Sequence, residues 1–169
     1  CITASTLLEA VKNLPEQPIT FTINDNDKSV TIHYLNGHYD MAGFGSDEYP
    51  MMQDESDIRF DMDAATLCNS IDQSLYAVSY DAQRPVMTGI SYTFAGEKVE
   101  CAASDGHKLV RNTYLLAGNA EDCRFILSAK AAKIVKLLLQ KKEGNVEVSY
   151  NKRNIVFKTD TDSFSTRLI

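Results

Sequence analysis

The chain has no tryptophan, only four prolines and four cysteines, and no long apolar run in its 169 residues. None of its apolar stretches approaches the roughly 18 residues that a membrane-spanning helix needs. Residues 1–14 also lack the basic region that precedes the apolar core of a signal peptide. The cysteines show neither C-x-x-C spacing nor nearby histidines, which argues against a zinc site or a disulfide framework. We therefore expect a cytoplasmic protein with buried reduced thiols at Cys1, Cys68, Cys101 and Cys123.

Basic residues are also in the minority. The chain has 17 lysines and arginines and 23 acidic residues, which gives a net charge of −6. A surface that is acidic overall argues against a protein coated with nucleic acid, because neutralising phosphates requires a basic surface. One segment is the exception, since residues 128–142, "SAKAAKIVKLLLQKK", contain lysines and no acid.

The pattern within that segment predicts an amphipathic helix. At 100° per residue its apolar and polar side chains separate into two arcs. The arc expected to face a sheet holds Ala131, Ile134, Val135 and Leu138. The other arc holds Lys130, Lys133, Lys136 and Gln140. Taken alone, such a lysine face is typical of a solvated helix surface, and a nucleic-acid contact needs further support.

Two parts of the chain share one pattern, a helix followed by a three-stranded meander. The first copy has a helix over 5–14, ended by Pro15, and strands at 19–23, 29–35 and 38–44, with a turn at Asn36-Gly37. The second copy has a helix over 128–142 and strands at 146–150, 155–159 and 164–169. The offset of about 125 to 127 residues indicates a repeated module.

The residues between the copies add a strand at 57–62, a helix over 63–78, and strands at 86–94, 98–104 and 107–115. Turns are expected at Gly96 and at Asp105-Gly106. A whole module is therefore strand, helix and meander, followed by another helix and meander, and its class is α+β. The acidic, proline-containing stretch at 46–57 is suited to a linker between modules.

The segment "AASDGHKLVR", residues 102–111, contains the residue types of a hydrolase in Ser104, Asp105 and His107. A catalytic site would need these groups to converge in space, and the chain has no G-x-S-x-G elbow. Asp-Gly between alternating strands is, by contrast, a strong hairpin signal because both residues tolerate a positive φ. The pattern favours a turn.

The same hairpin also carries a family resemblance. "SDGHKL" resembles the T-D-G-H-R-L hairpin of the bacterial sliding clamp, the β subunit of DNA polymerase III. Arg84 with "MTG" at 87–89 resembles the R-x-x-L-N-G stretch that precedes it in that family. "FGSDEYP" resembles the acidic aromatic-proline stretch that ends a clamp domain, so the resemblance covers essentially the whole chain in order.

The resemblance implies the DNA clamp fold, with helices on one face of antiparallel sheets. Family members are head-to-tail dimers of three-domain chains that close a ring around duplex DNA and tether the replicative polymerase. Residues 1–53 would be the second half of the first domain, and residues 54–169 most of the second, without its end or the third domain. The implied role is that of a non-catalytic, cytoplasmic, nucleoid-associated subunit of a DNA polymerase, with no cofactor or metal.

The resemblance also implies two sets of functional residues. Those facing DNA in the ring lumen would be Lys130, Lys133, Lys136 and Gln140, with Lys12 from the first helix. The helix over 63–78 has no lysine or arginine and carries Asp63 and Asp72, so we expect it to contribute little to DNA contact.

The second implied set is an apolar pocket for short linear motifs of polymerases, the clamp loader and repair proteins. It comprises Met87, Ser104, Gly106, His107, Lys108 and Leu109. Ser104 and Lys108 stand where the family has threonine and arginine, so one methyl contact and one planar donor fork are lost, which could shift partner preference. A generic α+β interaction module without a ring remains the main alternative, and the hydrolase the weaker one.

Overall fold

The computed structural model describes residues 1–49 and 56–169, which divide into two compact units, Cys1–Met52 and Gln53–Ile169. The predicted linker at 46–57 falls partly on residues 50–55, so the expected boundary after residue 53 lies outside the described residues. No helix within the described ranges has the length and apolar character required to cross a membrane.

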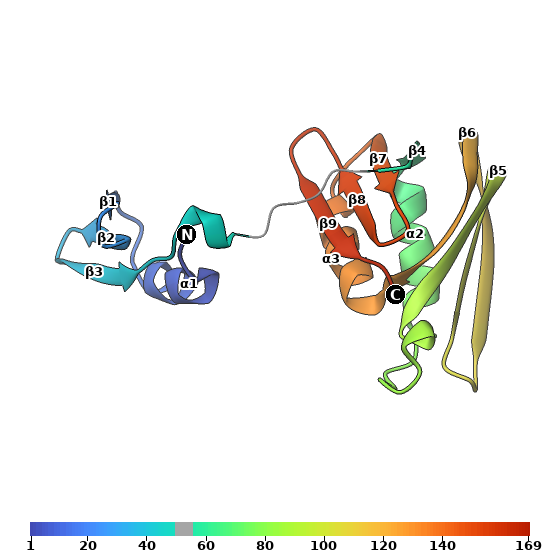
Figure 1. The fold of residues 1–169 in the computed structure, drawn as a ribbon, viewed down its shortest axis with the longest axis horizontal. Helices are drawn as coiled ribbons and strands as arrows, with labels where there is room; N and C mark the ends of the chain where they lie inside the picture. Colours follow the sequence, from blue (N-terminus) through green and yellow to red (C-terminus); the bar gives the residue numbers. More distant parts are fainter. Residues whose placement is uncertain (50–55) are drawn as a thin grey trace. The chain divides into compact units, whose positions relative to one another are not determined.

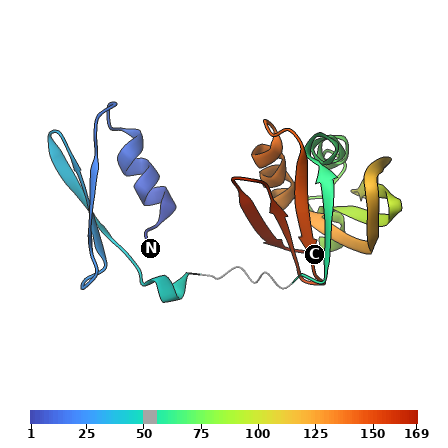
Figure 2. The ribbon, with the colours of Figure 1, turned by 90° about the horizontal axis from the view of Figure 1, so that it is seen from above.

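The N-terminal unit is one helix and a three-stranded antiparallel meander (Figures 1 and 2). Its elements are α1 (Ala4–Lys12), β1 (Thr20–Asn24), β2 (Ser29–Tyr34) and β3 (Gly37–Ala42), followed by the 3-10 helix η1 (Ser46–Glu48). Tyr34 of β2 pairs with Gly37 of β3, so a tight hairpin is present, but its two loop residues are Leu35 and Asn36, one position before the predicted Asn36-Gly37 turn. Every residue of β1 is exposed and α1 has no buried residue, so this small unit keeps its core around Val30, Ile32 and Met41.

The C-terminal unit contains two helices packed on antiparallel strands. Its elements are β4 (Ile58–Asp63), α2 (Ala64–Leu75), η2 (Pro85–Met87), β5 (Gly89–Ser104), β6 (Leu109–Ser128), α3 (Ala129–Leu139), β7 (Asn145–Tyr150), β8 (Asn154–Lys158) and β9 (Ser163–Arg167). One sheet has the order β4-β7-β8-β9, and the other is formed by β5 and β6. α2 and α3 lie side by side (Figures 1 and 2).

Strand pairing confirms that the C-terminal unit is internally duplicated. β4 precedes α2 but pairs with β7, the first strand after α3, and Asp63 lies opposite Asn145. The end of β6 precedes α3 but pairs with the start of β5, the first strand after α2, and Ser128 lies opposite Gly89. Each half therefore contributes one strand to the sheet of the other half.

The two helix starts repeat the same construction. The Asp63 carboxylate accepts a hydrogen bond from the Thr66 N–H at 2.8 Å, and the Ser128 hydroxyl accepts one from the Ala131 N–H at 3.2 Å. Both residues are side-chain N-caps, which satisfy a backbone donor that has no partner within the helix. In each case the first helical N–H donates to the residue just before the partner strand, Ala64 to Gly144 and Ala129 to Thr88.

β5 is a continuous run of strand conformation that reverses direction near Gly96. Gly96 has φ 57°, and the register with β6 shifts on both sides of it. Sixteen extended residues would span about 50 Å, yet Gly89 and Ala103, near the two ends of β5, line one hollow. The turn expected at Gly96 is therefore present within β5.

The observed strand β6 is longer than the strand predicted from the sequence. The strand predicted over 107–115 begins at Leu109 and continues to Ser128. Residues 116–128 include a polar stretch, "AGNAED", that hides the strand pattern from sequence reading. The strand predicted over 86–94 begins only at Gly89, because Pro85–Met87 form a 3-10 helix.

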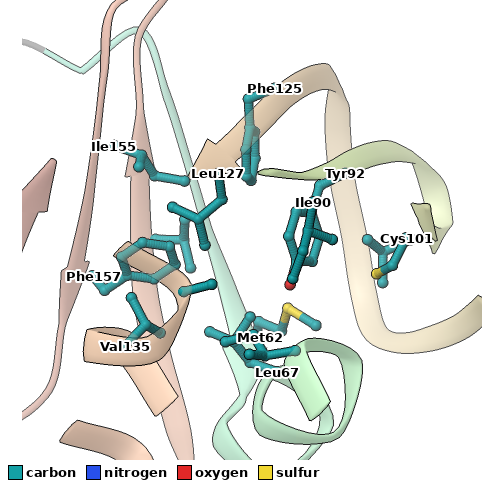
Figure 3. Close-up of a cluster of buried hydrophobic side chains, with 14 of the residues drawn as sticks. Met62, Leu67, Ile90, Tyr92, Cys101, Phe125, Leu127, Val135, Ile155 and Phe157 are labelled. Atoms are coloured by element: carbon teal, nitrogen blue, oxygen red, sulfur yellow. The ribbon is translucent and has the colours of Figure 1, made fainter. Parts of the chain in front are cut away.

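The core of the C-terminal unit lies between the sheets and the two helices (Figure 3). Aromatic rings connect its layers, with 4.4 Å between the ring centroids of Phe60 and Phe94 and 5.3 Å between those of Tyr92 and Phe125. Inside it, the Ser70 hydroxyl donates to the Leu67 carbonyl oxygen and contacts the Tyr92 hydroxyl at 3.0 Å. This polar contact fixes α2 against β5, because a buried hydroxyl that loses its partner is costly.

The inward face of α3 differs from the predicted arc. Ala131 and Val135 are buried as expected, but the other buried residues are Ala132 and Leu139 rather than Ile134 and Leu138. α2 packs beside α3 and covers that flank, so the buried arc is rotated toward α2 relative to one that faces a sheet alone.

Candidate functional site

The hairpin region singled out in the sequence lies beside a groove of about 260 Å³ on the outer face of β5 and β6. Strand alternation explains its position. Small residues point outward along β5, while their neighbours Ile90, Tyr92 and Cys101 are buried in the core. Larger side chains on either side then form the walls. The lining residues are Val86, Met87, Gly89, Ser91, Ala102, Ala103, Ser104, Leu109, Arg124 and Ile126.

Gly89 permits the close strand approach beneath this groove. A Cβ added there would lie 2.5 Å from the Leu127 carbonyl oxygen and 2.8 Å from the Ile126 methyl carbon Cγ2. Real Cβ atoms do not approach backbone oxygens so closely. The glycine therefore keeps β5 and β6 in register under the groove.

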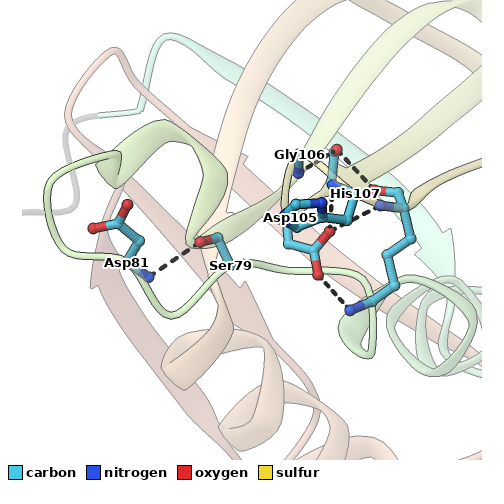
Figure 4. Close-up of polar contacts among 7 residues, drawn as sticks. Ser79, Asp81, Asp105, Gly106 and His107 are labelled. Carbon is cyan, nitrogen blue, oxygen red and sulfur yellow. Dashed lines mark hydrogen bonds and ion pairs between the residues drawn. The ribbon is translucent and has the colours of Figure 1, made fainter.

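The hairpin tip has four loop residues, 105–108, between Ser104 and Leu109 (Figure 4). The Asp105 carboxylate accepts hydrogen bonds from the N–H groups of His107 and Lys108 at 3.0 and 2.9 Å and forms an ion pair with the Lys108 ammonium. The Ser104 hydroxyl donates to the Lys108 carbonyl oxygen at 2.8 Å and accepts from the Gly106 N–H at 3.1 Å. Gly106 has φ 92°, a conformation that favours glycine, and the expected turn at Asp105-Gly106 is present within this four-residue loop.

These contacts give the hairpin residues a structural role. Asp105 contacts the backbone of His107 and the side chain of Lys108, and the Ser104 hydroxyl is engaged with the backbone. A hydrolase triad would need the carboxylate to orient the imidazole and the imidazole to contact the hydroxyl. The hydrogen bonds of Ser104 and Asp105 serve the turn instead, so the geometry does not support a catalytic cluster.

The loop before β5 supports the same end of the groove. The Met87 carbonyl oxygen accepts a hydrogen bond from the Ser79 N–H at 2.8 Å. The Ser79 hydroxyl in turn accepts one from the Asp81 N–H at 3.1 Å, as Figure 4 shows. Asp81 also forms an ion pair with Arg84 at 2.9 Å. A Cβ on Gly106 would lie 3.3 Å from the Arg84 guanidinium, so the hairpin tip and this loop are in contact.

The structure brings together half of the predicted pocket residues. Met87, Ser104 and Leu109 line the groove, whereas Gly106, His107 and Lys108 lie in the hairpin tip and do not line it. Sequence reasoning missed Val86, Ser91, Arg124 and Ile126. The period-two pattern of "ISYTF" could have indicated Ser91, but Arg124 and Ile126 lie in the strand segment that was not predicted.

Replacing Asp105 with alanine should loosen the hairpin tip without disturbing the core. The contacts with Lys108 and His107 lower the pKa of Asp105 below its ordinary value of 3.8, so they favour the ionised form. Because the pKa of Asp105 is lower in the folded state, its contacts contribute to stability above the ordinary pKa of an aspartate. That contribution is lost progressively as the pH falls from the ordinary pKa toward the lowered one. At pH 7 we expect the variant to lose protection of the His107 and Lys108 amides, measured by NMR hydrogen exchange relative to the intrinsic exchange rate. The wild-type tip should lose the same protection only as the pH falls toward the lowered pKa of Asp105.

Asp160→Ala is a matched control, because Asp160 is also an exposed loop aspartate and lies in the turn between β8 and β9. Equal exchange at His107 and Lys108 in wild type and Asp105→Ala would show that the carboxylate does not hold the tip.

The outward face of α3 contains the second set of predicted residues. Lys130, Lys133 and Gln140 are exposed, as an interaction surface requires. Lys136 is half-buried, and its ammonium lies 2.5 Å from the Asp72 carboxylate of α2. Lys12 is exposed at the end of α1 in the other unit.

The cysteines match the expectation only in part. Cys101 and Cys123 are buried, but Cys68 is half-buried and Cys1 is exposed. Burial raises the pKa of the Cys101 thiol to about 12 and that of Cys123 to about 11, so both remain protonated at neutral pH. Within residues 1–49 and 56–169 there is no group of three or more histidines, cysteines or acids placed to hold a metal ion.

Comparison with known proteins agrees with this architecture. Residues 61–169 match the family model of the DNA polymerase III beta subunit, central domain. The chain is 23% identical over 165 residues to the beta sliding clamp of Staphylococcus epidermidis, covering 96% of this chain and 43% of that protein. The corresponding protein of Staphylococcus aureus is 24% identical, with the same coverage. The chain thus spans less than half the length of these relatives.

Solved structures show the same fold. The DNA polymerase sliding clamp of Bacillus subtilis superimposes with a TM-score of 0.88 at 22% identity, over 99% of this chain and 44% of that one. A sliding clamp of Bartonella birtlesii, solved with griselimycin bound, gives 0.88 at 20% identity, over 99% and 46%. The family match extends over most of the chain and over both halves of the duplicated unit, and the chain belongs to the DNA polymerase III beta subunit family.

Proposed function

We propose that the full-length protein is a sliding clamp, which encircles duplex DNA and tethers the replicative polymerase during DNA synthesis. The observation that carries the proposal is the match of residues 61–169 to the central domain of the DNA polymerase III beta subunit. The internal duplication of the C-terminal unit also supports the proposal. A ring can be built from repeated modules whose helices all lie on one side. The active form is a homodimer, located with the nucleoid in the cytoplasm.

The charge distribution fits a topological tether. Lys130 and Lys133 are exposed on α3 and can approach phosphates without reading bases. The protein is otherwise acidic, with a net charge of −6, which opposes nonspecific adhesion of DNA elsewhere on its surface. Processivity then arises from enclosure of the duplex, and this subunit of the polymerase holoenzyme performs no chemistry.

The groove beside the hairpin is the proposed docking site for short linear motifs of polymerases, the clamp loader and repair proteins. Val86, Met87, Leu109 and Ile126 provide apolar walls, and Leu109 is 73% exposed, so a partner would cover it. Methionine adapts to different apolar partners. Ser91, Ser104 and Arg124 supply polar contacts at the rim. His107 and Lys108 lie in the adjacent tip and could contact a longer peptide.

Retention on circular DNA tests the clamp function directly. Full-length protein is loaded by its clamp loader and ATP onto a nicked circular plasmid, and high salt is then added before and after linearisation. A ring should remain on the circle in high salt, because salt screens charge contacts but does not open a topological link. It should leave rapidly once the DNA has ends.

Equal retention on circular and linear DNA would contradict the clamp and indicate ordinary contact binding. Absence of retention with an active loader would favour an interaction module without a ring.

A further inference from the structure

The only charged residue of α2 lies against the helix that carries the lysines. Asp72 is that residue, and its carboxylate oxygen is 2.5 Å from the Lys136 ammonium of α3. The two side chains are 49% and 34% exposed, so the pair lies at the surface seam between the helices rather than in the core. The seam is the place where α2 meets the proposed DNA-facing surface.

The lysines of residues 128–142, which contain α3 and the turn after it, therefore differ in their surroundings. Within the described part of the chain, Lys130 and Lys133 form no ion pair, and both are exposed. Lys136 is neutralised by Asp72, and Lys142 is paired with Asp162 at 3.0 Å. The number of lysines in residues 128–142 thus overstates the positive charge that this stretch offers to a phosphate.

The pair is a weak candidate for a purely stabilising contact. Ion pairs at this level of exposure contribute little to folding, because water screens them and ordering two side chains costs entropy. The pair should affect the binding of DNA more than it affects the stability of the fold. Each lysine that neutralises a phosphate releases a counterion, which adds about 0.9 to the slope of log K against log salt. A lysine held by a carboxylate does not add that term.

We propose that Asp72 is an internal counterion that withholds Lys136 from the DNA backbone and so weakens the attraction between the clamp and duplex DNA. The inference rests on the proposed clamp function. A sliding ring needs loose electrostatic contact, since enclosure already prevents its loss and every tight phosphate contact slows translation. Asp72 keeps the electrostatic attraction weak, because it lowers the number of α3 lysines that are available to DNA phosphates.

The test compares full-length wild type with Asp72→Asn for binding to short linear duplex DNA, without loader, by fluorescence anisotropy over a range of salt concentrations. Asp72→Asn should steepen the slope of log K against log salt by about one unit. Its affinity advantage should consequently grow about fourfold as salt falls from 200 to 50 mM. Asp61→Asn is the charge-matched control, because Asp61 is exposed on β4, where its neighbours Phe60 and Met62 face the core.

A double-mutant cycle separates release of Lys136 from a general change in net charge. In a Lys136→Gln background, Asp72→Asn should leave the salt slope unchanged, because there is no lysine to release. Equal slopes for wild type and Asp72→Asn, or an equal steepening by Asp61→Asn or in the Lys136→Gln background, would overturn the proposal. So would the absence of salt-dependent binding in both proteins. Loss of topological retention by wild type would instead refute the clamp function itself, which keeps the two failures distinct.

Discussion

Leu127→Ala should lower the free energy of unfolding of the C-terminal unit by about 2–5 kcal/mol. Leu127 is fully buried at the end of β6, where it contacts the core shared by both sheets and both helices. The substitution removes apolar contacts and leaves a cavity that close-packed neighbours cannot fully close. Because domains are stable by only about 5–15 kcal/mol, the variant should unfold at a clearly lower urea concentration.

The measurement is urea unfolding followed by circular dichroism, with the slope of the transition unchanged. Leu137→Ala makes the same chemical change on the exposed side of α3, where Leu137 is 72% exposed, and should shift stability by well under 1 kcal/mol. Similar midpoints for the two variants would contradict the position of the core.

Leu109→Asp should weaken binding of a polymerase-derived peptide to the full-length protein by more than tenfold. Leu109 forms a wall of the groove, and burying a carboxylate against an apolar peptide side chain is costly unless it is paired. Residues that anchor an interface commonly account for 2 kcal/mol or more, about 30-fold in affinity. Stability should change little, because Leu109 is 73% exposed in the free chain.

Leu115→Asp is the control for this experiment. Leu115 lies on the same strand and is also 73% exposed, but it does not line the groove. Titration of a fluorescent peptide should distinguish the two variants, with Leu115→Asp close to wild type. Comparable losses in both would mean that the peptide senses the charge of β6 rather than the groove.

Local patterns predicted the elements whose neighbours lie close in sequence. Two helices were predicted because apolar side chains recur at helical spacing, Leu7 and Val11 in the first and Ala131 and Val135 in the second. The meander strands followed from alternation. The order of these helices and strands along the chain was then enough to predict the α+β class, and it agreed with the family resemblance.

Long-range contacts were beyond local patterns. The continuation of β6 to Ser128 is stabilised by its pairing with β5, although its polar residues favour a loop. For the same reason Arg124 and Ile126 were absent from the predicted pocket. The partner of Lys136 is Asp72, 64 positions earlier, and no spacing rule within one helix could have connected them.

The exchange of strands between the halves also constrains the order of events during synthesis. β4 emerges from the ribosome early, but its partner β7 follows roughly 80 residues later. At about 5–20 residues per second this leaves β4 unpaired for about 4–16 s. Neither half can complete its sheet alone, so the C-terminal unit should acquire protease resistance in one late step, after residue 150 has left the exit tunnel. Nascent chains arrested before that point would expose β4 to holding chaperones.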